Sequence, residues 1–402
     1  MTTNRTRLAV VCDPPEEGWP SMDLTGEMVL RHLAERHAGL VAPERFCPPF
    51  RRRAARLPGL GGRGAAKNVD RLLNRFWDYP RALRRAAGGG RRFDLYHVVD
   101  HSYSQLVHVL PPGRAVVTCH DLDTFRCLLE PGREPRPAWF RAMTRRILDG
   151  LRKAAAVACD SEATRDALVG HGITPADRAY VVYLGTHPEC SPEPHPEADA
   201  EATRLLGPFD PDAPPDLLHV GSNIPRKRVD VLLDVFAAVR RSVPGARLVK
   251  VGGALPPDLA RRAEALGVAD AVVTLPYFSP LSSRDRAALA AVYRRAALVL
   301  QPSEAEGFGL PVAEALACGT PLLASDIPVL REVGGDAPVY RPVGDVAGWS
   351  EAALSLLDQR RSSPDAWAAR RAAGVERARL YSWSTHADRL AEVYRDVLSR
   401  LP

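Results

Sequence analysis

Two glutamates, Glu306 and Glu314, stand eight positions apart across a glycine-rich turn. Pro311 falls where a helix would begin, because its fixed φ suits the first helical position and its missing N–H would be unpaired there anyway. Gly307 and Gly309 let the backbone come close to a ligand, and the free N–H groups at a helix start favour an anion. The spacing therefore predicts a seat for a diphosphate, with one acid in the loop and one on the helix.

A purely structural interpretation of these acids is also open. An acidic residue near a helix start stabilises the helix by about 0.3–1 kcal/mol without any ligand. Glu314, however, lies in a helix that is apolar almost all round and that ends at Gly319. Such a helix is normally buried, and a buried carboxylate without a partner is costly. We therefore favour the ligand-binding interpretation.

A cationic loop follows the predicted strand Leu217–Val220. It runs from Gly221, which permits a tight turn, to Arg226 and Lys227 ahead of a helix that begins near Val229. A guanidinium and an ammonium together suit a diphosphate that gains negative charge as it leaves. The alternative is an Arg-Lys pair on the surface of a helix start, and the glutamate motif in the same half argues against it.

Short apolar runs alternate with helical patterns along the whole chain, which predicts parallel sheets covered on both faces. We expect an α/β protein of two doubly wound, Rossmann-like domains, with ligands at the carboxyl ends of the strands. The stretch 186–216 is rich in Pro and acidic residues, and we expect the interdomain hinge at its opening. A first helix is predicted over Met22–Arg36 with Ser21 as its N-cap. The strands are predicted at Leu8–Cys12, Leu95–Val99, Ala115–Cys119, Ala155–Cys159, Ala179–Leu184, Leu217–Val220, Ala246–Val251, Ala271–Leu275, Ala297–Leu300 and Pro321–Ala324.

Polar residues also follow strands in the first half of the chain. A histidine at a strand end can donate to hydroxyl groups or steady a developing cation, although it can equally be a hydrogen-bonded structural residue. The catalytic candidate of this half is His120, which follows the third predicted strand. The acceptor-binding candidates are Glu17, Gly18, Trp19, His101 and Asp121.

Composition bounds the class of protein. The chain has 402 residues with 46% hydrophobic and 25% charged residues, as expected of a folded two-domain protein. No run of about 18 apolar residues predicts a membrane span, and the first residues show no signal-peptide pattern. Seven cysteines, never spaced as C-x-x-C, predict reduced thiols and no structural zinc. We expect a cytoplasmic protein.

One segment is strongly basic. Residues 45–92 contain 14 Lys and Arg residues against only two acids, Asp70 and Asp78, and apolar residues are interleaved with them. This pattern is typical of a surface that meets an anionic acceptor or an anionic membrane leaflet, which would make the protein peripheral at the inner membrane surface. A solvated Arg-rich face remains the alternative. No nucleic-acid-binding module accompanies the charge, so we expect no nucleic acid partner.

With these motifs in place, the chain resembles the retaining glycosyltransferases of the GT-B fold, in the family called family 4 or group 1. The resemblance is carried by Pro302-Ser303-x-x-Glu306-Gly-Phe-Gly-Leu-Pro311-x-x-Glu314-Ala-Leu-Ala-x-Gly319-Thr-Pro321, by the loop from Gly221 to Lys227, and by Val117-Thr-x-His120-Asp121. It covers the second half almost throughout and the first half only at its strand ends.

The resemblance implies transfer of a sugar from a nucleotide-diphosphate sugar to an acceptor hydroxyl, with retention, on one face of the sugar and without a metal ion or other cofactor. It implies an acceptor domain at 1–190, a donor domain at 191–375 facing it across a cleft, and a last segment, 376–402, that packs back on the first domain. The catalytic residues would be His120, Arg226, Lys227 and Glu306, with Glu314 at the ribose. The donor-binding set would be Gly221, Ser222, Arg226, Lys227, Glu306, Gly307, Phe308, Gly309, Leu310 and Glu314.

Two departures and two alternatives accompany the resemblance. Ser222 stands where many relatives carry Arg, and the first loop has a single Gly18 where many carry two glycines. The nucleobase is expected near 275–279, with Tyr277 or Phe278 beside it, while the base, sugar and acceptor are not readable. A GT-B epimerase or phosphorylase is one alternative, and a catalytically silent nucleotide-sugar-binding subunit is the other.

Overall fold

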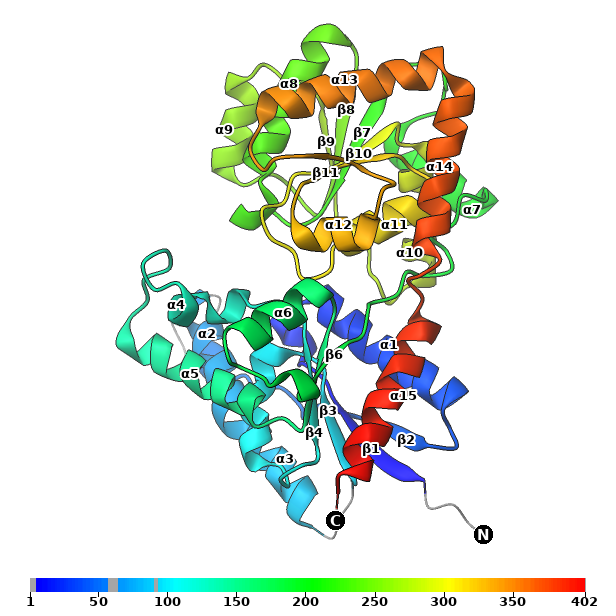
Figure 1. Ribbon diagram of the computed structural model, residues 1–402. Helices are drawn as coiled ribbons and strands as arrows, with labels where there is room; N and C mark the ends of the chain where they lie inside the picture. The colour runs from blue at the N-terminus through cyan, green and yellow to red at the C-terminus, as the bar shows by residue number, and fades with distance from the viewer. Residues whose placement is uncertain (1–4, 57–63, 90–92, 402) are drawn as a thin grey trace. The chain divides into compact units, whose positions relative to one another are not determined.

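The computed structural model describes residues 5–56, 64–89 and 93–401. The chain divides into two compact units, the first formed by residues 1–184 and 383–402 and the second by residues 185–382. Each unit is built on a six-stranded parallel sheet (Figure 1). The predicted α/β class with two doubly wound sheets is confirmed.

The first unit has the strand order β2-β1-β3-β4-β5-β6. Its strands are buried apolar runs, as a parallel sheet covered on both faces requires. β2 was not predicted: it contains Pro43, and an edge strand that pairs with β1 alone tolerates a proline. The strands are β1 Thr6–Val11, β2 Val41–Phe46, β3 Leu95–Val98, β4 Ala115–Cys119, β5 Ala156–Cys159 and β6 Ala179–Val181.

Helices cover both faces of this sheet (Figure 1). On one face, Val29 and Leu33 of α1 pack with Leu390 and Tyr394 of α15 against the apolar side chains of β1. The helix α1 begins at Pro20 with Trp19 as its N-cap, so the prediction of Ser21 as N-cap is wrong; a proline in the first turn places the cap one residue before it. The helices are α1 Pro20–Arg36, α2 Gly64–Leu73, α3 Tyr79–Gly88, α4 Arg126–Leu129, α5 Ala138–Arg152, α6 Glu162–Gly170 and α15 Trp383–Ser399.

The second unit has the strand order β12-β11-β10-β7-β8-β9. β7 and β10 lie side by side at its centre, which brings the loops that follow them to the same edge of the sheet. β12 was not predicted, because three half-buried residues leave little apolar signal. The strands are β7 Asp216–Val220, β8 Arg247–Val251, β9 Val272–Leu275, β10 Leu298–Gln301, β11 Leu322–Ser325 and β12 Val339–Arg341.

The helices of the second unit also form two layers (Figure 1). Phe236 of α8 and Trp349 of α13 belong to the apolar core on one face of the sheet, and α11 lies on the other face with α14 against it. Among the described residues, no helix combines the length and the apolar character that a bilayer crossing requires. The helices are α7 Pro196–Leu206, α8 Val229–Ser242, α9 Pro257–Ala265, α10 Ser283–Arg295, α11 Leu310–Ala317, α12 Pro328–Gly334, α13 Val346–Ser362 and α14 Pro364–Ala378.

Candidate active site

The two motifs of the second half meet at the edge where β7 and β10 end. Lys227 Nζ lies 2.6 Å and 2.8 Å from the two carboxylate oxygens of Glu306. The loops also share a backbone hydrogen bond, from Glu304 N to Arg226 O at 2.9 Å. The loops that carry Arg226, Lys227 and Glu306 thus lie at one edge of the sheet, as the sequence predicts. The side chains of Lys227 and Glu306 are largely buried, with exposures of 12% and 6%.

Glu306 is held as a carboxylate by several neighbours. Gln301 Nε2, at the end of β10, donates to Glu306 Oε1 at 2.8 Å. Burial alone would raise the pKa of Glu306, but Lys227, the Ser303 hydroxyl and the charge of Arg226 lower it below its ordinary value. The carboxylate is thus fixed in position and in charge state at neutral pH.

The glycine-rich turn after Glu306 has the backbone that the motif predicts. Gly309 has φ of 92° and caps α11, and a Cβ there would lie 2.7 Å from Leu330 Cδ2. Pro311 lies in the first turn of α11. Gly319 has φ of 66° just beyond the helix end, as a C-terminal glycine does. Phe308 packs edge-on against Tyr381 at 5.3 Å between ring centroids, and Leu310 is half-buried.

Glu314 has a different environment from Glu306. Its carboxylate accepts a hydrogen bond from the Tyr293 hydroxyl of α10 at 2.9 Å. Burial raises the pKa of Glu314 to about 7, and the Tyr293 hydrogen bond only partly opposes this. The two glutamates of the motif therefore differ in charge: Glu306 is ionised at neutral pH, whereas Glu314 titrates there.

The remaining donor-side predictions lie around the same edge. Gly221 follows β7 directly and is followed by Ser222, and Tyr277, on the loop after β9, is 56% exposed. A Cβ on Gly221 would lie 3.2 Å from His219 Nε2 and 3.8 Å from Lys227 Cδ. Close approach of these side chains gives a physical reason for glycine at this position.

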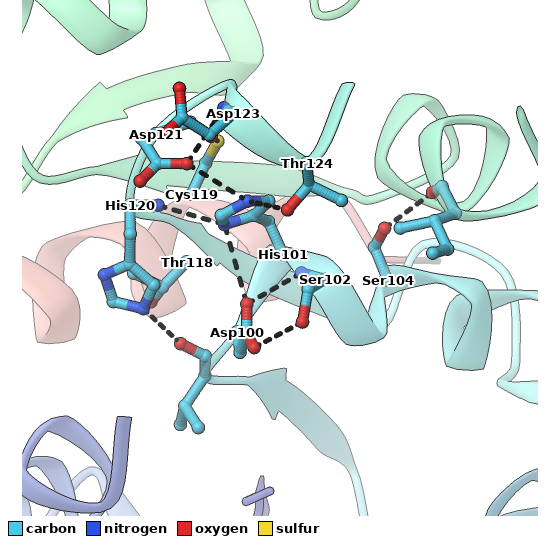
Figure 2. Close-up of polar contacts among 12 residues, drawn as sticks. Asp100, His101, Ser102, Ser104, Thr118, Cys119, His120, Asp121, Asp123 and Thr124 are labelled. Carbon is cyan, nitrogen blue, oxygen red and sulfur yellow. Dashed lines mark hydrogen bonds and ion pairs between the residues drawn. The ribbon is translucent and has the colours of Figure 1, made fainter. Parts of the chain in front are cut away.

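In the first unit, His120 directly follows β4 (Figure 2). The residue is 7% exposed. Its Nδ1 lies 2.6 Å from Asp160 Oδ2, and its Nε2 lies 2.7 Å from the carbonyl oxygen of Val99. Because both partners can only accept, both ring nitrogens carry protons and the ring is an imidazolium. Burial alone would lower the pKa of His120, but Asp160 and the other acceptors raise it to about 9. Both N–H groups of the ring are therefore committed to protein partners.

His101 lies beside His120 and is neutral (Figure 2). The backbone N–H of His120 donates to His101 Nδ1 at 3.3 Å, so the ring proton is on Nε2, which lies 3.1 Å from the Thr124 hydroxyl. Burial lowers the pKa of His101. Asp121 lies 3.7 Å from the same Nε2 and caps the following turn through the N–H of Asp123.

The first loop divides into a buried acid and an exposed ring. Glu17 is 7% exposed and is bound by Arg71, through Nε at 2.8 Å, and by the Tyr103 hydroxyl at 2.8 Å. Gly18 has φ of 73°. Trp19 is 50% exposed. The acid is thus committed within the unit, while the indole is available at the surface.

Asp13 is a further buried polar residue at the carboxyl end of the first sheet. It follows β1, is 4% exposed, and lies beside Asp100, which follows β3. Burial, and then the Asp100 carboxylate, raise the pKa of Asp13 well above its usual range. Asp100 accepts a hydrogen bond from the backbone N–H of Ser102 at 2.7 Å. The two acids follow neighbouring strands of the first sheet, β1 and β3, and burial favours the protonated form of Asp13.

Part of the basic segment is neutralised within the first unit. Arg53 forms a bidentate pair with Asp78 at 2.6 Å and 2.8 Å, and Asp70 accepts the N–H groups of residues 53–55. Three arginines of the basic segment, Arg63, Arg91 and Arg92, lie in the ranges 57–63 and 90–92, which are outside the described residues. In the described ranges 5–56, 64–89 and 93–401, no group of three or more His, Cys, Asp or Glu residues is arranged to hold a metal ion.

Comparison with known families identifies two matching models. Residues 214–359 match the model described as "Glycosyl transferases group 1", and residues 26–189 match that of "Glycosyltransferase Family 4". The D-inositol 3-phosphate glycosyltransferase of Mycolicibacterium paratuberculosis is 31% identical over 373 residues, which cover 87% of this chain and 78% of that protein. The protein of the same name from Segniliparus rotundus is 39% identical over 186 residues, 44% of this chain. The chain spans only 39% of the length of that relative.

Solved structures share the fold at low sequence identity. Sucrose-phosphate synthase from Thermosynechococcus elongatus superposes with a TM-score of 0.73 at 21% identity, covering 99% of this chain and 100% of that one. Alr3699/HepE of Anabaena, in complex with UDP-glucose, superposes with a TM-score of 0.69 at 17% identity, covering 98% and 100%. These likenesses establish a GT-B architecture.

Proposed function

The chain belongs to the group 1, or family 4, glycosyltransferases, and on this premise we propose that it transfers a sugar from a nucleotide-diphosphate sugar to an acceptor hydroxyl with retention of anomeric configuration. The Lys227–Glu306 pair carries the proposal. It joins the loops after β7 and β10 and fixes a cation and a carboxylate at the edge where such sheets bind ligands.

The chemistry assigned to the second unit follows from the charges there. Lys227 and Arg226 would stabilise the diphosphate as negative charge develops on it. Glu306, held ionised, would accept hydrogen bonds from hydroxyls of the donor sugar, and Glu314 those of the ribose. Because Lys227 and Arg226 would supply positive charge to the diphosphate, we propose that transfer needs no divalent metal, and activity is expected to persist in excess EDTA.

The acceptor is assigned to the first unit. His120 is an imidazolium whose N–H groups are both occupied, so we propose that it acts as a fixed positive charge and not as a general base. The relatives named above act on D-inositol 3-phosphate by their names, and this polyol phosphate is therefore the first acceptor to test.

We also propose that the first unit contacts an anionic membrane surface. The helical run from α2 through α3 exposes Val69, Leu72, Leu73 and Trp77, with Trp77 54% exposed, and Arg81 stacks 3.3 Å above the Trp77 ring. Exposed apolar side chains with basic neighbours suit a lipid interface. Vesicles with anionic lipid should retain the protein at low salt and release it at high salt. A Trp77→Ser variant should be retained less, and equal retention by neutral vesicles would overturn this proposal.

Donor binding is tested by thermal stability against a panel of UDP-, GDP-, ADP-, CDP- and dTDP-sugars. A ligand at 100 times its Kd stabilises the native state by about 2.7 kcal/mol, so the correct donor should raise Tm clearly. The Lys227→Met variant should lose this response, whereas a Lys153→Met control should keep it. No response to any member of the panel would contradict the proposed function.

A further inference from the structure

Lys250 is a fully buried lysine in β8, which lies between β7 and β9 in the sheet of the second unit. It is 0% exposed, between the buried apolar residues Val249 and Val251. Its Nζ lies 3.0 Å from Gly221 O, 3.2 Å from Gly252 O and 3.4 Å from Gly253 O. These three backbone carbonyls use all three N–H donors of the ammonium. No carboxylate among the described residues forms an ion pair with it.

The carbonyls that Lys250 binds belong to the two loops at the end of β7 and β8. The loops touch: a Cβ on Gly252, which has φ of 120°, would lie 2.1 Å from Gly221 O. Because the three carbonyl oxygens point to the Lys250 ammonium, their partial negative charges are neutralised there. An anion that binds to these loops would therefore be repelled less by the carbonyl oxygens.

Two other titratable side chains, Lys227 and His219, lie within 4 Å of a Cβ built at Gly221. Lys227 is matched by Glu306 at 2.6 Å. His219 on β7 has its Nδ1 2.9 Å from Leu300 O, and burial, followed by the charges of Lys250 and Lys227, lowers the pKa of His219 to about 4, so that it is neutral. Lys250, in contrast to Lys227, forms no ion pair with a carboxylate among the described residues, and a buried charge without an opposite partner is costly.

We propose that Lys250 is a positioning residue for the donor diphosphate, holding the Gly221 and Gly252 loops with their carbonyls turned inward and supplying the positive charge that the bound diphosphate neutralises. The inference rests on the proposed function of the same site. Burial lowers the pKa of Lys250 to about 8, and a bound anion would raise it again. Diphosphate binding should therefore be coupled to protonation of this one side chain.

The coupling gives a readout that a merely structural lysine would not produce. Binding of UDP to the wild-type protein, measured calorimetrically at pH 8.5 in two buffers of different ionisation enthalpy, should be accompanied by net proton uptake. UDP affinity should fall as pH rises from 8 towards 9.5, where the phosphates of UDP no longer titrate. GDP and ADP serve as probes in the same way if UDP is not the preferred nucleotide.

The Lys250→Met variant should bind UDP about 10- to 100-fold more weakly at pH 7, as expected for one charge about 6–12 Å from the diphosphate at an effective dielectric constant near 20. It should show no proton uptake and no loss of affinity above pH 8, and its affinity for uncharged uridine should be unchanged. Lys153→Met, an exposed lysine of the first unit, is the matched control and should behave as wild type.

The outcomes separate the two claims. If wild type binds none of the nucleotide diphosphates, the proposed function fails. If wild type binds one of them without proton uptake at pH 8.5, the inference about Lys250 is overturned and the proposed function stands, and this comparison needs no variant. The inference about Lys250 is also overturned if the Lys250→Met variant binds UDP as tightly as wild type does and with the same dependence on pH.

Discussion

The charge state of His120 is the sharpest prediction for the first unit. Its two nitrogens face a carboxylate and a carbonyl, so the ring should be an imidazolium at neutral pH. A rise in the pKa from 6.5 to about 9 corresponds to roughly 3 kcal/mol of stabilisation of the charged form in the folded protein. Because the folded pKa is raised, this stability is fully present below pH 6.5 and is lost as pH rises through 9.

Replacing Asp160 by Asn removes the carboxylate that raises the pKa of His120 while keeping a hydrogen-bond acceptor. The free energy of unfolding of the Asp160→Asn variant should be about 2–3 kcal/mol below that of wild type at pH 7, and the difference should shrink towards pH 10. Asp166→Asn, an exposed acid on the next helix, is the control and should change stability little. Urea titrations at several pH values measure the difference.

NMR of ring-labelled histidine observes the same group directly. Wild-type His120, assigned by a His120→Gln variant, should show the spectrum of a doubly protonated ring at pH 7.5 and titrate near 9. The Asp160→Asn variant should bring this titration down towards 6.5. A wild-type ring that is neutral at pH 7.5, or a stability difference independent of pH, would refute the reasoning.

Three further predictions concern the second unit. Because the pKa of Glu314 is raised, the free energy of unfolding of wild type should fall by at most roughly 3 kcal/mol as pH rises from 4.5 through 7. The Glu314→Gln variant has no such acid, so its urea titrations should not show this fall. Lys227→Met and Glu306→Gln should each lower kcat/KM by about 10- to 100-fold, and the double variant should be no worse than the poorer single one, since each leaves the other group unpaired; full additivity in steady-state kinetics would contradict the pairing. Gly309→Ala should lower the free energy of unfolding by about 1–3 kcal/mol, because its φ of 92° and the contact of the new Cβ with Leu330 both disfavour alanine, and an unchanged melting temperature would argue against it.

Much of the architecture was readable from local pattern. The central strands of the second unit are buried apolar runs bounded by turn residues, and the predicted run Leu217–Val220 differs from β7 by a single residue. The two missed strands lie at sheet edges, where partial exposure weakens the apolar signal: β2 carries Pro43, and β12 has only three residues. The helix cap was misassigned because Pro20 and Ser21 offer competing start signals, and the proline decided the position.

The candidate site was predictable as far as strand order alone positions residues. Lys227 and Glu306 were expected on one edge because both follow strands of the same parallel sheet, and their side chains meet. Pairings across the fold were not readable in this way. The acceptors of His120 come from Val99 and Asp160, distant in the sequence, and they decide its protonation. Lys250 was missed because a single lysine within an apolar strand carries no local sign of what it contacts.

The most direct test of sugar transfer is an NMR measurement of the product. The protein is incubated with the donor that raises its Tm and with D-inositol 3-phosphate or another hydroxyl acceptor, and the anomeric signal of the transferred sugar is followed together with nucleotide diphosphate release. We expect release that depends on the acceptor, a product with the anomeric configuration of the donor, and strong loss of both in Lys227→Met. An inverted product, or binding of the donor without release under any acceptor, would contradict the proposed reaction.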